Sequence, residues 1–345
     1  MQNSQDSTHY ESLVSNSLLA QMRAHFKTST LAWPTWWRSL SGAKKVLPLI
    51  PIHFYLITLH LLGGLTTDHL AICSILMILI YSGPIFKDIY DFIFPFFLTV
   101  VIYDSQRYYS DYLRGPIHVS EPYHFDQAFF GIFTQQHGIL TPNEWWQLHT
   151  HPILDLITGF AYLVFFSVFI LNSAYFLFVL GNRGTPYFSK TQITQYARMM
   201  PWGFFWLNML GYSTYYWYAA APPWYVAKYG LGPAQLGVAA STAGCARFDQ
   251  ILGTHFFSDM YGRSADVFGA IPSLHIAYPL LATVFAFHFK KARTFCTLFY
   301  LLMCFSAIYL NHHYVLDILW GSAYALAIGF IMISYTRRKL THELS

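Results

Sequence analysis

Charged residues are scarce in this chain. Asp, Glu, Lys and Arg make up only 10% of its 345 residues, whereas a soluble domain usually carries about 25%. The net charge of +4 is too small and too scattered for a nucleic-acid binder. Four cysteines without a paired motif exclude a disulfide scaffold. Because 55% of the residues are hydrophobic and 19% are aromatic, disorder is excluded as well, and the composition predicts an integral membrane protein.

Long apolar segments support this class. The hydrocarbon core of a bilayer is about 30 Å thick and requires about 20 apolar residues per helix. The sequence predicts eight such segments, near 47–64, 69–84, 89–104, 156–180, 199–220, 273–289, 294–310 and 315–335. The shorter ones leave a tilted or re-entrant arrangement open. Since no segment alternates with period two over the length of a strand, we expect an all-α bundle of about eight (six to eight) transmembrane helices.

The basic residues predict the orientation of this bundle. Residues 1–46 form a polar, interfacial N-terminal segment, 47–335 a polytopic membrane domain, and 336–345 a basic tail. With eight spans, 15 of the 20 Lys and Arg residues lie on the side of the two termini. This asymmetry places both termini in the cytoplasm. The long loops 105–155 and 221–272 then lie on the opposite side, and their aromatic content indicates a packed cap.

Two polar clusters open membrane segments on that opposite side. The first runs from Gly269 to His275, and the second from Tyr309 to Asp317. Polar residues within membrane spans are costly and usually functional. His313 and Asp317 are four residues apart, so on a helix they share one face, and the carboxylate can fix the imidazole tautomer. The free ring nitrogen is then a nucleophile.

The first cluster supplies the complementary chemistry. Pro272 suits the first turn of a helix. The backbone N–H groups near Ser273 would then face outward, where a phosphate binds well. His275, one turn further, can donate a proton to a leaving oxygen. Together the clusters predict phosphoryl transfer through a phosphohistidine.

The motif Pro272-Ser273-x-His275, followed by His313-x-x-x-Asp317, resembles the type 2 phosphatidic acid phosphatase superfamily. The similarity to its inositol phosphorylceramide synthase branch is greater, and it covers roughly 85–335. Its further pieces are Gly244-Cys-Ala-Arg-Phe-Asp249, Val267–His275, Tyr309–Asp317, Tyr103–Tyr108 and Phe125–Gly131. The resemblance implies a catalytic core of this type at about 156–335.

The resemblance implies that His313 is the nucleophile, Asp317 its partner and His275 the general acid and base. Phosphatases of the superfamily carry a Ser-Arg pair before the nucleophile, where this chain has Ser306 and Ala307. Another cation must therefore hold the phosphate. We expect Arg247 first, because an arginine fork binds two phosphate oxygens, and then Lys228 or Arg263. Leu274 replaces a glycine of the phosphatase motif, which suits a lipid acceptor better than water.

Other residues near these motifs have two interpretations each. His312 is either an interfacial residue or a phosphate ligand. Asp104 with Arg107 is either an ion pair at a helix end or part of a headgroup pocket, and Asp126 is similar. Asp249 is expected to orient Arg247, and is kept as a further headgroup candidate.

The resulting hypothesis is a membrane phosphotransferase without metal or cofactor. It would transfer inositol phosphate from phosphatidylinositol to ceramide or a related lipid alcohol, and release diacylglycerol. The alternatives are a lipid phosphate phosphatase that uses water, and a non-catalytic membrane scaffold or transporter. We expect the site on the lumenal face of the Golgi or the periplasmic face of a bacterial inner membrane. The sequence leaves the need for an accessory subunit open.

Overall fold

The computed structural model describes residues 30–83, 86–262 and 267–344, which divide into two compact units between Phe94 and Pro95. The first unit holds α2 (Gly42–Val46), α3 (Leu49–Leu61) and α4 (Thr67–Tyr81), and α5 (Lys87–Ser105) begins in it. Within this unit α3 and α4 pack against each other. Of the predicted N-terminal segment, residues 1–29 lie outside the described residues.

The second unit is built from long helices joined by short ones. Its elements after α5 are η2 (Gln106–Tyr108), α6 (Ser110–Leu113), α7 (Ser120–Phe130), β1 (Ile132–Thr134), β2 (Gly138–Leu140), α8 (Pro142–Leu148), α9 (Pro152–Ala174), the π-helix η3 (Tyr175–Leu180), α10 (Gly181–Arg183), α11 (Lys190–Trp217), α12 (Pro223–Tyr229), α13 (Cys245–Leu252), α14 (Phe256–Tyr261), α15 (Leu274–Phe289), α16 (Arg293–Tyr309) and α17 (Val315–Leu344). The strands β1 and β2 form an antiparallel hairpin that pairs Ile132 with Leu140.

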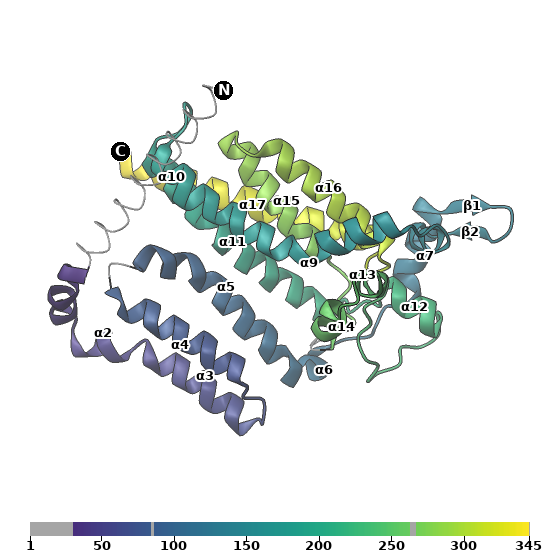
Figure 1. Ribbon diagram of the computed structural model, residues 1–345, viewed down its shortest axis with the longest axis horizontal. Helices are drawn as coiled ribbons and strands as arrows, with labels where there is room; N and C mark the ends of the chain where they lie inside the picture. Colours follow the sequence, from purple (N-terminus) through teal and green to yellow (C-terminus); the bar gives the residue numbers. More distant parts are fainter. Residues whose placement is uncertain (1–29, 84–85, 263–266, 345) are drawn as a thin grey trace, which may run out of the picture. The chain divides into compact units, whose positions relative to one another are not determined.

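Helix α15 is central to the second unit. It packs against α9, α11, α16 and α17, which lie beside it in Figure 1. Its buried positions include alanines and leucines on nearly every side, as expected for a helix surrounded by others. Close approach is helped by small residues: a Cβ at Gly211 would lie 2.9 Å from the Leu274 side chain.

The two predicted outer loops gather at one end of this bundle. Helices α7, α8, α12, α13 and α14 all lie near the start of α17, away from its C-terminal end (Figure 1). A backbone hydrogen bond joins the two loops, because Ala221 N–H donates to His118 O at 2.9 Å. Ala220, directly before the second loop, donates its N–H to Phe268 O at 2.8 Å. The loop segments are therefore tied to the chain just before α15.

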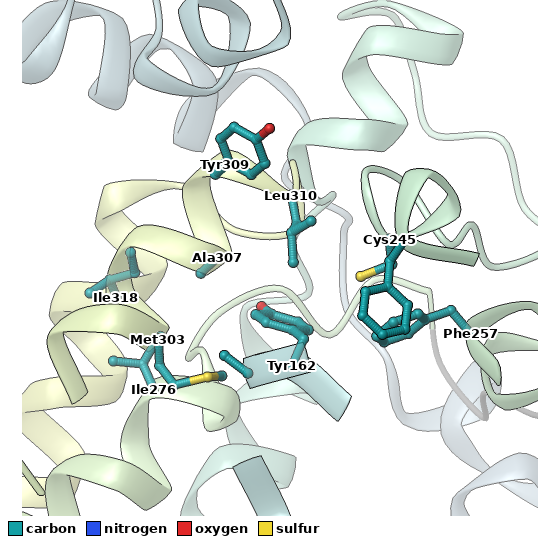
Figure 2. Packing of buried hydrophobic residues seen from close by; sticks show 11 residues of the cluster. Tyr162, Cys245, Phe257, Ile276, Met303, Ala307, Tyr309, Leu310 and Ile318 are labelled. Carbon is teal, nitrogen blue, oxygen red and sulfur yellow. The ribbon is translucent and has the colours of Figure 1, made fainter. Parts of the chain in front are cut away.

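A buried hydrophobic cluster lies beneath this end of the bundle (Figure 2). It contains Ala161, Tyr162, Cys245, Phe248, Phe257, Ile276, Met303, Ala307, Tyr309, Leu310 and Ile318. These residues come from six helices and from the turn after α16. Packing among them fixes the positions of the helix ends that carry the polar clusters.

Each of the eight predicted apolar segments contains a helix. Two helical stretches, Pro152–Arg183 and Val315–Glu343, are long and apolar enough to cross a membrane. Thr67–Tyr81, Leu274–Phe289 and Arg293–Tyr309 are apolar but shorter. The all-α architecture is confirmed, apart from the small hairpin of β1 and β2, and the number of spans remains a prediction.

Candidate active site

His275 and His313 meet although they are far apart in the sequence. His275 is the second residue of α15, and His313 lies in the turn between α16 and α17. Nδ1 of His275 is 3.2 Å from Nε2 of His313. This distance fits a hydrogen bond between the two imidazoles.

The turn that carries His313 results from how α16 ends. Asn311 has a positive φ of 61°, a conformation that asparagine tolerates better than most residues. The N–H of Asn311 donates to Ile308 O, and the N–H of His312 donates to Ala307 O, each at 3.0 Å. These are the two bonds of a Schellman motif, which ends a helix and redirects the chain. His312 and His313 follow directly.

Asp317 and a backbone carbonyl bind the other nitrogen of His313. Nδ1 of His313 lies 3.2 Å from Asp317 Oδ2 and 3.1 Å from Ala270 O. Both partners are acceptors, so Nδ1 carries the proton and Nε2 keeps its lone pair. Burial lowers the pKa of His313 to about 4, so the ring is neutral at physiological pH. His313 precedes α17, so the pair is held by a turn and a helix start rather than by one helix.

The start of α17 is held by a second carboxyl group. Asp126 of α7 is fully buried and accepts the N–H groups of Val315 and Leu316, at 2.7 and 3.0 Å. Burial raises the pKa of Asp126 to about 7, and these two hydrogen bonds act in the opposite direction. Asp126 is not among the residues that line the cavity described below. Its contacts are those of a helix cap, and the predicted headgroup role has no geometric support.

His312 occupies a stack of aromatic rings. Tyr261 and Tyr162 lie on its two faces, with ring centroids 5.0 and 5.3 Å away. The ring of Tyr162 also stacks on His275, at 4.8 Å. Nε2 of His312 lies 3.3 Å from Cys245 Sγ. Burial lowers the pKa of His312 well below its ordinary value, so His312 is a neutral ring that supports the site from the side.

A cavity of about 820 Å³ opens onto the two catalytic candidates. It is lined by Thr99, Val100, Tyr103, Gln106, Phe165, Phe166, Phe204, Asn208, Tyr212, Tyr215, Pro222, Trp224, Ala240, Ser241, Asp259, Met260, Tyr261, Val267, Gly269, Ala270, Leu274, His275, Tyr278, His312 and His313. Most of these are apolar or aromatic, and the described lining contains no Lys or Arg. The size suits a lipid better than a small polar substrate.

The expected phosphate-binding cations lie elsewhere. The Arg247 guanidinium pairs with Asp155 at 2.6 Å, donates to Gln147 Oε1 at 3.0 Å and donates to Tyr309 O at 3.4 Å. Lys228 is exposed, with its ammonium 5.2 Å from the Tyr229 ring. Neither lines the cavity, and Arg263 lies outside the described residues.

Two expectations about individual groups are wrong. Asp249 does not orient Arg247: it accepts N–H bonds from Phe257 and Ser258, at 3.0 and 3.2 Å, at the start of α14. The Ser273 N–H does not face outward, because it donates to Asp317 O at 3.0 Å. Helix α15 begins at Leu274, so Pro272 precedes the helix instead of lying in its first turn.

The remaining candidates are close to the site without contacting it. Ser273 is buried, and its Oγ has no hydrogen-bond partner among the described atoms. Asp104 and Arg107 form an ion pair with each other at the end of α5. Neither of these two lines the cavity, whereas their neighbours Tyr103 and Gln106 do.

Three supporting residues have no sequence signal that could have identified them. Asn143 donates from Nδ2 to the carbonyls of Ile308 and His313, both at 3.0 Å, and so bridges the two ends of the turn. Tyr162 lies within an apolar run, and Asp155 is a single carboxylate at a helix start. Their partners are more than 90 residues away, as for the Asp155–Arg247 pair. Within the described parts of the chain, no three His, Cys, Asp or Glu side chains group as a metal site.

Comparison with known proteins defines the class. A family model of the PAP2 superfamily matches residues 137–331, which include both histidine motifs. The chain therefore belongs to the PAP2 superfamily and is a helical integral membrane protein. The resemblance predicted from the motifs is confirmed.

Curated relatives narrow the similarity. Phosphoinositol dihydroceramide synthase of Bacteroides thetaiotaomicron is 34% identical over 281 residues, which are 80% of this chain and 87% of that protein. The inositol phosphorylceramide synthase catalytic subunit of Schizosaccharomyces pombe is 34% identical over 51% of this chain. That of Saccharomyces cerevisiae is 33% identical over 39%. This chain spans only 40% and 33% of the two fungal proteins. No solved structure matches the chain significantly.

Proposed function

We propose that this protein transfers inositol phosphate from phosphatidylinositol to ceramide or a closely related lipid alcohol, and releases diacylglycerol. One observation carries the proposal: His275 Nδ1 lies 3.2 Å from His313 Nε2, and Asp317 orients the His313 ring. Similarity to proteins named as synthases of inositol phosphorylceramides, over 80% of the chain in one case, supports the substrate pair.

The first half-reaction forms a phosphohistidine. The lone pair on His313 Nε2 attacks the phosphorus of phosphatidylinositol, and the bond to the diacylglycerol oxygen breaks. His275 acts here in its protonated form, with a proton on each ring nitrogen, which the bound phosphate anion favours. Its Nδ1 proton passes to the leaving oxygen, and His275 is left as a neutral imidazole. Positive charge that develops on the His313 ring is stabilised by the Asp317 carboxylate.

The second half-reaction reverses these roles. His275 removes the proton from the primary hydroxyl of the acceptor lipid, and the resulting oxygen attacks phosphorus. The bond from phosphorus to His313 breaks and restores the free nucleophile. The apolar lining of the cavity favours a lipid alcohol over water as acceptor, because it accommodates acyl chains and excludes water.

Arg247 has a positioning role in this proposal. It binds the last carbonyl of α16, at Tyr309, and is neutralised by Asp155. It therefore supports the turn that carries His313. Of the expected phosphate-binding residues, His312 is the one that lines the cavity, directly before His313 in the sequence.

The proposed orientation places both termini in the cytoplasm and the cavity toward the lumenal or periplasmic face. It rests on the 15 basic residues of the terminal side and on the positive-inside rule. In this orientation the two long loops, 105–155 and 221–272, cap the outer end of the site. We propose that the catalytic core comprises about 156–335, with supporting residues from α7 and α8.

The decisive experiment uses the purified full chain with inositol-labelled phosphatidylinositol and ceramide. We expect the label in a ceramide lipid, and no such product from His313→Ala. His149→Ala is the matched control, because His149 is exposed and stacks on Trp145 outside the cavity. Label found only in water-soluble inositol phosphate would refute the transferase proposal. Turnover by a folded His313→Ala protein would refute the assignment of the nucleophile.

A further inference from the structure

A hydrogen-bonded pair lies in the apolar part of the cavity. The Tyr278 hydroxyl of α15 donates to Asn208 Oδ1 of α11 at 2.6 Å. Asn208 Nδ2 in turn donates to Phe204 O, four residues earlier in its own helix, at 2.8 Å. Both side chains are buried, and both line the cavity. The catalytic scheme makes no use of this pair.

The hydrogen-bonded pair of Tyr278 and Asn208 lies among aromatic side chains. The Tyr278 ring lies 4.6 Å from Phe204, 5.9 Å from Phe169 and 6.0 Å from Phe165. A polar group among aromatic rings is costly unless it is hydrogen-bonded. For the same reason, a ligand group that bonds here is strongly favoured over one that cannot.

Tyr278 is close to the reacting groups along the cavity. It follows His275 by three residues on α15, a rise of about 4.5 Å along the helix axis. Phe165 borders both residues, with its ring centroid 4.8 Å from that of His275. When the reacting oxygen of a lipid lies at His275, the groups next to that oxygen in the lipid therefore lie beside Tyr278.

The direction of the hydrogen bonds determines what this position can recognise. The phenolic hydrogen of Tyr278 is used by Asn208, so the oxygen presents acceptor lone pairs to the cavity. Ceramide carries an amide N–H and a secondary hydroxyl within a few bonds of its reacting primary hydroxyl, and both can donate. Diacylglycerol carries ester oxygens at the corresponding places, which only accept.

We propose that Tyr278, oriented by Asn208, is the specificity subsite that distinguishes a sphingoid acceptor from a glycerolipid by accepting a hydrogen bond from its amide or secondary hydroxyl. This inference rests on the proposed transferase function. It assigns Tyr278 to recognition of the acceptor and leaves the covalent steps to His275 and His313.

The first test compares two activities of the purified full chain. One is transfer of labelled inositol phosphate to ceramide, and the other is exchange of labelled diacylglycerol into phosphatidylinositol, which needs only the first half-reaction. We expect Tyr278→Phe to lower the ratio of ceramide transfer to exchange about tenfold, the loss typical of one buried hydrogen bond. Tyr300→Phe is the matched control, because the Tyr300 hydroxyl bonds Ser322 Oγ at 2.9 Å outside the cavity. That variant should keep the wild-type ratio.

The second test changes the ligand. Ceramide analogues that are methylated on the amide nitrogen or lack the secondary hydroxyl remove one donor each. At least one analogue should be transferred about tenfold less well than ceramide by the wild-type protein. With Tyr278→Phe the same analogue and ceramide should be transferred equally well. Persistence of the full discrimination in Tyr278→Phe would overturn the proposal.

A third variant reverses the polarity of the subsite. Asn208→Leu leaves the Tyr278 hydrogen free to donate to an ester oxygen, so the ratio should shift toward diacylglycerol exchange. Asn172→Leu is its control, since Asn172 makes the same bond to a carbonyl four residues earlier, at 2.9 Å, away from the cavity.

The outcomes separate the two proposals. Equal losses of ceramide transfer and exchange in Tyr278→Phe would overturn the subsite and indicate a structural role. A wild-type protein that exchanges diacylglycerol but never labels ceramide would instead refute the proposed acceptor.

Discussion

The contact between Asp317 and His313 can be tested by replacing one carboxylate oxygen. In Asp317→Asn the side chain keeps its shape but loses its charge and presents an amide. Asp317 Oδ2 lies 3.2 Å from His313 Nδ1 and also accepts the Tyr314 N–H at 3.0 Å. Both bonds are buried, so the substitution acts directly on the proposed nucleophile.

The expected magnitude follows from the two acceptors around Nδ1. A hydrogen bond to a charged partner contributes about 1.5–3 kcal/mol, and each 1.36 kcal/mol of barrier is tenfold in rate. In serine protease triads the same change costs about 10⁴-fold, because the tautomer is lost. Here Ala270 O, at 3.1 Å, also accepts from Nδ1 and preserves the tautomer. We therefore expect a loss of about 10²-fold.

The assay is a single turnover of phosphatidylinositol with enzyme in excess, followed by quenched measurement of diacylglycerol release. This isolates formation of the phosphohistidine. Asp126→Asn is the matched control, since Asp126 also binds the start of α17 but makes no contact with His313. We expect it to keep most of the rate. A loss below about threefold in Asp317→Asn, or an equal loss in both variants, would refute the reasoning.

Three further predictions follow from charge and burial. Because the pKa of His313 is about 4, kcat/KM should stay above half its maximum at about pH 5.5, where a histidine of ordinary pKa would leave about a tenth; a fall to a tenth would contradict the burial argument. The folded-state pKa of Asp126, about 7, lies above its ordinary value of 3.8. Between these two pH values the native state therefore holds a proton that the unfolded state releases. The stability that this proton provides is lost as the pH rises through this window. The melting temperature of Asp126→Asn should therefore fall less steeply with rising pH in this window than that of the wild type. Parallel curves for the two proteins would disprove the raised pKa of Asp126. Arg247→Ala leaves buried Asp155 without its cation. Because the Arg247 side chain is 25% exposed, we expect a loss of about 2 kcal/mol in stability, less than the roughly 3–5 kcal/mol of a fully buried pair, and an unchanged KM for phosphatidylinositol. A large rise in KM at unchanged stability would restore Arg247 as a phosphate ligand.

Residues close together in the sequence were the most predictable part of the site. The spacing of His313 and Asp317 predicts their contact, because four residues bring side chains together at a helix start as well as within a helix. The resemblance to the superfamily, carried by short motifs, is confirmed by the match over residues 137–331. The prediction for Arg247 could not account for Asp155, which lies 92 residues away and binds that cation. The same holds for Asp126, whose partners at the start of α17 are 189 and 190 residues distant.

The sequence by itself determined the membrane class and the helical segments, and it singled out the two histidine motifs, because composition, apolar run length and short-range spacing are local properties. Tertiary structure alone decided which polar groups that are distant in the sequence meet. It brings the lone pair of His313 to His275, removes Arg247 from the cavity by pairing it with Asp155, and places Tyr278 and Asn208 together among aromatic rings. Such contacts depend on how helices pack around α15. Charge is scarce in the sequence, and four of the charged residues, Asp126, Asp155, Arg247 and Asp317, hold the helix ends that present the two histidines.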